Sequence, residues 1–175
     1  MCSSDLFQAE GSYDPAEPGD SAGRLETSTG RDYVKVSART PGSFNAAPAV
    51  GPVVISEIHY HPPNIAGDDN ADDEFIELVN ISESAVLLGG DAQGRGAWLL
   101  ENAIEWAFPS DAVLMPGEYA LITSFDPSTN AAALASFRER YGAPQEVRVY
   151  GPWKGKLAND SQRVELNQRA ALAKL

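Results

Sequence analysis

Two strand-like segments separated by a long polar loop constrain this chain more than any other feature of its sequence. Apolar and β-branched residues dominate residues 53–60 (VVISEIHY) and 74–81 (EFIELVNI). Such residues fit a pleated, half-buried strand, and the turn formers that bound each run support that assignment. The loop between the two runs is rich first in proline and then in aspartate. The pattern predicts two strands of one sheet, with residues 74–81 as a central strand.

Short apolar segments separated by glycine and proline follow this pair at the spacing typical of a β-sandwich. We expect further strands at residues 85–88, 97–101, 104–108, 112–114, 119–123, 147–150 and 163–167. One segment departs from the pattern, because residues 128–141 are rich in alanine and repeat Leu134, Phe137 and Tyr141 on one helical face before Gly142. The sequence therefore predicts an all-β sandwich with one short helix inserted late in the domain.

The residues before the sandwich are polar and rich in turn formers. Residues 1–6 (MCSSDL) resemble the translated end of a sequencing-library adapter, so we expect them to be non-native. In residues 7–49 only Tyr33 to Val36 alternates like a strand, and a proline-rich segment follows. This region is either a loosely ordered linker or, as we interpret it, the end of a preceding module plus a linker. We assign residues 50–168 to the sandwich, truncated at its end, and residues 169–175 to a tail of uncertain structure.

The formal net charge of −12, from 13 basic and 25 acidic residues, limits the classes of partner that the chain can bind. No basic cluster is present, so the chain would repel a phosphate backbone, and we expect neither nucleic acid nor an anionic membrane as a partner. No run approaches the roughly 20 apolar residues that a membrane-spanning helix needs. The only cysteine, Cys2, lies in the segment interpreted as non-native, so we expect no disulfide and no thiolate chemistry.

Several short motifs occur in a characteristic order along the second part of the chain. They are ISEIHYHPP at residues 55–63, EFIEL at 74–78, Leu88-Gly89, Trp98, Phe108-Pro109, MPGEYALI at 115–122 and YGPWKGKLAND at 150–160. Their order resembles that of bacterial lamin tail domains over about residues 50–168. The resemblance implies an immunoglobulin-like β-sandwich with a non-catalytic interaction or scaffolding role, present as a module in large secreted or surface multidomain proteins.

The same resemblance implies an extracellular or cell-surface location and partners among the neighbouring domains of the same polypeptide, with a protein or a polysaccharide as a further ligand. The closing strand of the family has no counterpart after Asn167. We therefore expect an unpaired sheet edge, which invites pairing with another chain. The isolated chain is expected to self-associate or to be marginally stable.

The acidic loop contains the only dense cluster of candidate metal ligands. Asp68, Asn70, Asp72 and Glu74 alternate at a spacing that suits hard oxygen ligands for calcium. The EF-hand pattern fails, because Asp73 stands where that loop needs glycine. The alternative is a solvated acidic loop, which we expect to be mobile without an ion because its carboxylates repel one another. Calcium is the only cofactor that the sequence suggests.

Three tryptophans could carry a second kind of site. Trp98, Trp106 and Trp153 would form a carbohydrate-binding platform if their rings were exposed, and would pack in or over the core if they were not. An exposed platform would make the chain a carbohydrate-binding accessory domain of a secreted hydrolase. That function is our alternative to the interaction module.

Motifs of hydrolases and nucleotide-binding enzymes are missing from the sequence. His59 and His61 have a metal-like spacing but lack a third ligand residue. Glu57 and Glu77 lie within apolar strands and could face each other as a carboxylate pair, although such glutamates more often pair with an arginine. We therefore predict that the chain is not an enzyme.

Overall fold

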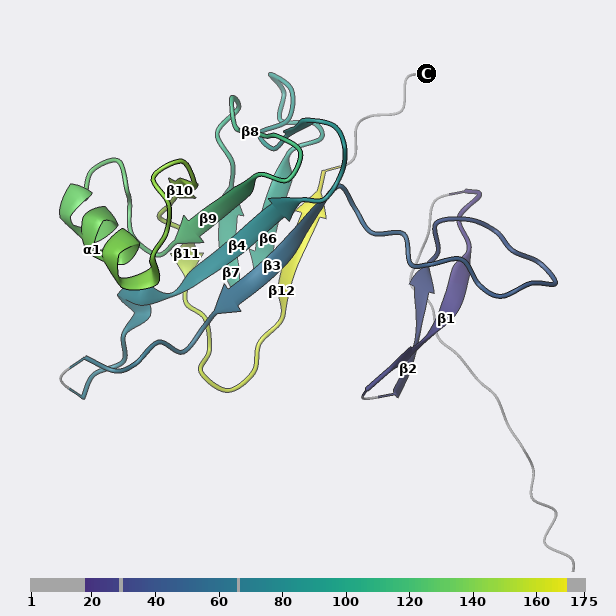
Figure 1. Cartoon of the computed structure of the whole chain (residues 1–175), viewed down its shortest axis with the longest axis horizontal. Coiled ribbons are helices and arrows are strands. Elements are labelled where there is room, and N and C mark those ends of the chain that lie inside the picture. The colour runs from purple at the N-terminus through teal and green to yellow at the C-terminus, as the bar shows by residue number, and fades with distance from the viewer. Residues whose placement is uncertain (1–17, 29, 66, 170–175) are drawn as a thin grey trace, which may run out of the picture. The chain divides into compact units, whose positions relative to one another are not determined.

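The computed structural model describes residues 18–28, 30–65 and 67–169 of the chain (Figure 1). The chain divides between Gly51 and Pro52 into two compact units. No helix in the described part of the chain is long and apolar enough to cross a membrane. The segment interpreted as non-native, residues 1–6, and the tail from residue 170 onward lie outside the described residues.

The first unit contains an antiparallel hairpin of β1 (Ala22–Thr27) and β2 (Gly30–Lys35). An isolated bridge between Val36 and Pro48 extends it. The sequence predicted only the strand that corresponds to β2. The segment AGRLET of β1 was missed because polar residues and glycine dominate it, so it carries little apolar alternation.

The second unit is a sandwich of two four-stranded sheets. The first sheet has the order β10-β9-β4-β3, with β3 at Val53–His59, β4 at Phe75–Asn80, β9 at Tyr119–Thr123 and β10 at Arg148–Tyr150. The second has the order β11-β7-β6-β12, with β6 at Trp98–Asn102, β7 at Ile104–Ala107, β11 at Lys154–Gly155 and β12 at Val164–Gln168. A separate ladder joins β5 (Val86–Leu87) to β8 (Val113–Leu114). The predicted all-β sandwich is confirmed.

The strands predicted at residues 97–101 and 104–108 form a hairpin. Its arms β6 and β7 pair Leu99 with Ala107 and Leu100 with Trp106. Asn102 has a φ of 77°, a left-handed conformation that asparagine tolerates better than most residues. Strand β11 was not predicted, because its two residues lie in a segment whose glycines and proline indicated only turns.

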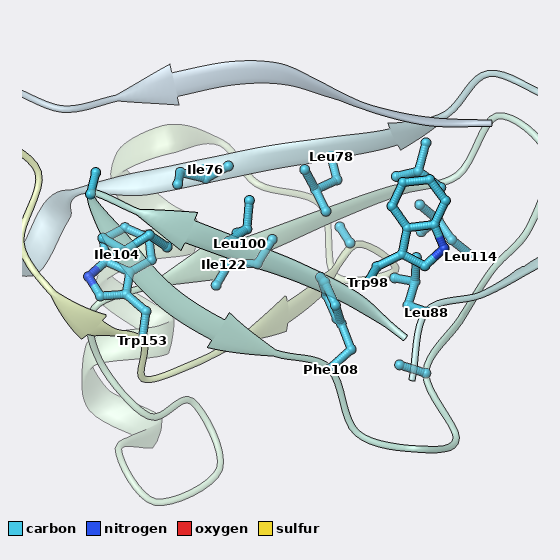
Figure 2. Close-up of a cluster of buried hydrophobic side chains, with 14 of the residues drawn as sticks. Ile76, Leu78, Leu88, Trp98, Leu100, Ile104, Phe108, Leu114, Ile122 and Trp153 are labelled. Carbon is cyan, nitrogen blue, oxygen red and sulfur yellow. The ribbon is translucent and has the colours of Figure 1, made fainter. Parts of the chain in front are cut away.

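The core fills the space between the two sheets (Figure 2). Ile76 and Leu78 on β4 point inward from one sheet, and Leu100 and Ile104 point inward from the other. Each of these side chains is almost completely buried. Full burial of a leucine or isoleucine stabilises a fold by about 1.5–3 kcal/mol relative to exposure, so the alternation seen in the sequence supplies most of the sandwich's cohesion.

Helix α1 (Ala131–Tyr141) packs against part of the outer face of the first sheet, at one end of its strands. The side chain of Asn130 caps it by accepting a hydrogen bond from the Ala133 amide at 3.0 Å, and Gly142 ends it at a φ of 64°. Phe137 packs edge-on against Phe75 of β4, with ring centroids 5.7 Å apart. The predicted late helix is thus confirmed, and it forms a second, smaller core outside the sandwich.

One buried polar side chain, Asn80 at the end of β4, ties three segments together. Its amide nitrogen donates to the carbonyl oxygens of Ser84 and Leu114, each at 2.8 Å. Its amide oxygen accepts from the backbone N–H and the hydroxyl of Ser82, at 2.9 and 2.8 Å. Because both donors and both lone pairs are used, the burial of this amide costs no hydrogen bond.

Candidate functional site

The acidic loop between β3 and β4 is held by partners from distant parts of the chain. Asp69 forms an ion pair with Lys156, and its other oxygen accepts from the Asn159 amide at 3.0 Å. These hydrogen bonds, first from Lys156 and then from Asn159, lower the pKa of Asp69. A cation from a distant part of the chain thus pairs with one of the loop's carboxylates, and the mobility of the loop in the absence of an ion stays a prediction.

A second anchor holds the other end of the same loop. Asp73 forms an ion pair with Arg140 of α1 and accepts a hydrogen bond from the Asn70 amide at 2.5 Å. The hydroxyl of Ser124, after β9, donates to the Ala71 carbonyl at 2.9 Å. The loop thus links β4 to the helix and to the segment before β12.

The predicted calcium ligands do not converge. Asn70 uses its amide nitrogen on Asp73 and on the Pro63 carbonyl, and Glu74 turns into the protein interior. Within residues 18–28, 30–65 and 67–169, no group of three or more His, Cys, Asp or Glu side chains is arranged to hold a metal ion. Asp68, Asn70, Asp72 and Glu74 therefore do not form the predicted site, because strand β4 begins immediately after Glu74 and carries its side chain inward.

Glu74 is a buried carboxyl group with half of its hydrogen-bonding capacity unused. Its side chain is 0% exposed. One oxygen accepts from the Leu157 backbone N–H at 3.2 Å, and the other, Oε1, has no partner. Burial raises the pKa of Glu74, and the Leu157 N–H and the nearby charge of Lys156 oppose that rise. This glutamate destabilises the fold when it is ionised.

Replacement of Glu74 with glutamine is expected to raise stability at neutral pH by on the order of 1 kcal/mol, because the amide cannot ionise and its oxygen can still accept from Leu157. A group with a raised folded pKa stabilises the fold below its unfolded pKa and loses that contribution as the pH rises through the folded value. The advantage of Glu74→Gln should therefore disappear on acidification. Urea denaturation of both proteins across acidic and neutral pH measures it, and an advantage that does not change with pH would contradict this account.

The three tryptophans do not form a carbohydrate platform. Trp98 and Trp153 are each 5% exposed and lie at opposite ends of the core cluster in Figure 2. Trp106 is half-buried and packs edge-on against Phe108, with ring centroids 6.0 Å apart. A sugar ring needs an exposed aromatic face, so the prediction of a binding role for Trp98, Trp106 and Trp153 is wrong for this arrangement.

The remaining candidate residues lie on β3 and β4. Glu57 pairs directly with Glu77 across the two antiparallel strands, and Glu77 accepts a hydrogen bond from the Ser56 hydroxyl at 2.6 Å. His59 is packed between Phe75 and Tyr141, with its Nε2 3.3 Å from the tyrosine hydroxyl, whereas His61 is exposed. The two histidines therefore do not share a site.

A groove on the outer face of the second sheet was not predicted from the sequence. It has a volume of about 770 Å³. Its apolar lining includes Leu99, Trp106, Ala107 and Pro152, its acidic lining is Glu101, Glu105 and Glu165, and its basic lining is Lys154 and Arg169. The three glutamates come from three neighbouring strands, β6, β7 and β12, so only the strand pairing reveals that they share one surface.

Two of these glutamates face each other across the β6–β12 ladder. Glu101 and Glu165 are directly opposite in the β6–β12 ladder, and Asn167 donates its amide to both carboxylates, at 2.8 and 3.3 Å. Like charges directly opposite on a sheet are unfavourable. Glu165 also forms an ion pair with Arg163, which is largely exposed. The groove is therefore lined by one more acidic than basic residue, since Lys154 lies opposite Glu105 in the β7–β11 ladder and Arg169 also lines the groove.

A family model for the lamin tail domain matches residues 46–171. The chain belongs to the lamin tail domain family. Lamin tail domains are immunoglobulin-like, non-catalytic domains that are generally involved in protein interactions, and the observed sandwich agrees with that fold. No curated protein matches the chain significantly. The acidic groove and the anchored loop both lie within the matched residues of this lamin tail domain.

Proposed function

We propose that this lamin tail domain is a non-catalytic interaction module of a secreted or surface multidomain bacterial protein, and that it binds basic segments of partner proteins in the groove on its second sheet. The observation that supports the proposal is a groove in which three glutamates, against the two basic residues Lys154 and Arg169, lie beside an apolar floor. The location rests on the order of sequence motifs and is tested separately, by whether an antibody against the domain labels intact cells.

The lining of the groove suits lysine and arginine side chains. Their aliphatic stems pack on apolar surface while their charged ends reach carboxylates. Leu99 and Ala107 form the apolar part of the floor, and Glu101 and Glu105 stand beside them. Part of the outer face of the first sheet, in contrast, is covered by α1. The overall charge of −12 attracts basic partners to the domain from a distance.

Binding of a fluorescent hexalysine peptide tests the proposal. The double variant Glu101→Gln and Glu105→Gln is expected to weaken its binding about fivefold or more, because two charge contacts in a partly exposed groove are lost. Fluorescence anisotropy at low salt measures the dissociation constant, and a hexaglutamate peptide should not bind.

The matched control is the double variant Glu57→Gln and Glu77→Gln, which removes the same amount of charge from the other sheet. It should leave hexalysine binding nearly unchanged. Equal weakening by both double variants would mean that the peptide responds to net charge alone, and the groove would then not be the binding site.

A further inference from the structure

Strand β12 leaves one side of its sheet open. It pairs with β6 over five consecutive residue pairs without a bulge, and none of the other described strands pairs with its second side. Ala103 donates its amide to the Arg163 carbonyl at 3.1 Å, and Arg169 donates its amide to the Ala97 carbonyl at 2.8 Å. Odd-numbered residues of this strand therefore direct their backbone groups toward β6. By the alternation of an antiparallel ladder, the groups that face the open side belong to Val164, Leu166 and Gln168.

Apolar surface lies beside this open edge. A hollow of about 340 Å³ is lined by Ile58 of β3, Tyr60, Leu157 and Val164 of β12, among others. Ile58 and Tyr60 are 38% and 44% exposed. An unpaired edge beside exposed apolar side chains favours the addition of another strand, because both the backbone groups and the apolar surface then become covered.

We propose that β12 pairs in the antiparallel direction with β12 of a second copy of this chain, about a two-fold axis at Val164. In this register Val164 faces Val164 of the partner copy as a hydrogen-bonded pair, since its backbone groups point outward. Arg163 then faces Glu165 of the partner copy, and the symmetry creates this contact twice. These two residues occupy non-hydrogen-bonded positions, where side chains of opposite strands lie closest.

Charge separates this register from its neighbours. If one copy of β12 is shifted by two residues along the other, Glu165 faces Glu165 of the partner copy. A shift by four residues places Arg163 opposite Arg169 of the partner copy. Each of these two registers therefore opposes like charges. A shift by one residue would place residues whose backbone groups point to the open side opposite residues whose groups point toward β6, so no ladder could form. The register centred on Asn167 pairs Glu165 with Arg169 but moves the axis away from the hollow, which lies at the Val164 end of the strand. The register centred on Val164 alone combines opposite charges with cover for Ile58 and Tyr60.

The dimer should be weak. Each copy carries a formal charge of −12, so the two copies repel at long range, and the pairing buries little area because Val164 is the first residue of β12 and the two segments overlap only over residues 163–165. Self-association should therefore depend on protein concentration over the range typical of transient interfaces. The proposed dimer does not depend on the groove as a binding site, because it requires only the edge of β12.

Disulfide trapping tests the register in the full chain with Cys2→Ser, which removes the only cysteine of the sequence. Opposed residues of a hydrogen-bonded antiparallel pair have Cα atoms about 5.5 Å apart, within the range that a disulfide spans. Under mild oxidation Val164→Cys should form a covalent dimer at a rate at least tenfold above Asn167→Cys. Faster trapping of Asn167→Cys would overturn the proposed register, and equal slow trapping of both would overturn the interface.

Charge exchange provides an independent measurement by sedimentation velocity. Arg163→Glu and Glu165→Arg should each weaken dimerisation at least tenfold, because each places like charges opposite one another twice, and the double exchange should restore it. The matched control Arg95→Glu makes the same charge change on the loop before β6, where Arg95 contacts Asp91, and should leave the dimer unchanged. Melting curves confirm that each variant is folded. A wild-type chain that stays monomeric at all concentrations, or a double exchange that fails to restore the dimer, would refute the proposal.

Discussion

Replacement of Asn80 with aspartate should destabilise the sandwich by about 3 kcal/mol or more, although the two side chains have nearly the same shape. The Asn80 amide nitrogen donates to the carbonyls of Ser84 and Leu114. An aspartate offers oxygen in place of that nitrogen, so both buried carbonyls lose their donor and face a carboxylate instead. The free energy of unfolding in urea measures the loss, which should be smaller at acidic pH, where the carboxyl group is protonated.

Asn130→Asp is the matched control for this exchange. Asn130 caps α1 through its side-chain oxygen, which accepts from the Ala133 amide. Aspartate supplies the same acceptor and adds a negative charge at the helix N-terminus, where it is favourable. Its stability should stay within about 0.5 kcal/mol of the wild type. A loss at Asn80→Asp no larger than at Asn130→Asp would show that the donor bonds of Asn80 do not stabilise the fold.

Truncation of Phe137 to alanine should cost about 3–5 kcal/mol, because its ring is the centre of the smaller core. The residue is 2% exposed and contacts the rings of Phe75, Phe125 and Tyr141. Without it α1 has little apolar surface left to hold it on the sheet. We expect a lower unfolding midpoint together with faster amide hydrogen exchange in α1.

Phe44→Ala makes the same chemical change at a side chain that is 97% exposed, and it should leave the unfolding midpoint unchanged. Hydrogen exchange also separates two outcomes for Phe137→Ala. If α1 keeps its protection while the midpoint falls, the ring supports the sheet rather than the docking of the helix. Unchanged values of both quantities would contradict the assignment of Phe137 to a core.

The sandwich could be predicted because its signals are local. The alternation in β4, the glycine at position 117 with a φ of 71° after Pro116, and the cap and stop residues of α1 each specify a short segment without help from the rest of the chain. Strands β1 and β11 could not be predicted from local sequence signals. Strand β1 is polar and strand β11 has only two residues. Each is a strand because it pairs with a neighbouring strand, and its own sequence carries no clear strand pattern.

The candidate site was predicted poorly because its contacts join residues far apart in the sequence. The acidic loop looked like unneutralised charge, since neither Lys156 nor Arg140 is near it in the chain. Glu74 looked like a surface ligand because it follows four aspartates, yet it is the first residue before a buried strand. The groove could not be predicted for the same reason, because Glu101 and Glu165 are far apart in the sequence and lie opposite each other only in the β6–β12 ladder.

The anchors of the acidic loop also bear on how the chain reaches its fold as it is made. Ser124, Arg140 and Lys156 contact the loop from sequence separations of 53, 67 and 87 residues. In a nascent chain the carboxylates of the acidic loop therefore have no ion-pair partners when they leave the ribosome. They stay unpaired until most of the sandwich has been synthesised. Contacts of such long separation slow folding, and repulsion within the unpaired loop slows it further. Salt or divalent cations in the surroundings would then accelerate folding more than they stabilise the finished domain, because the native cations replace them once Lys156 and Arg140 arrive.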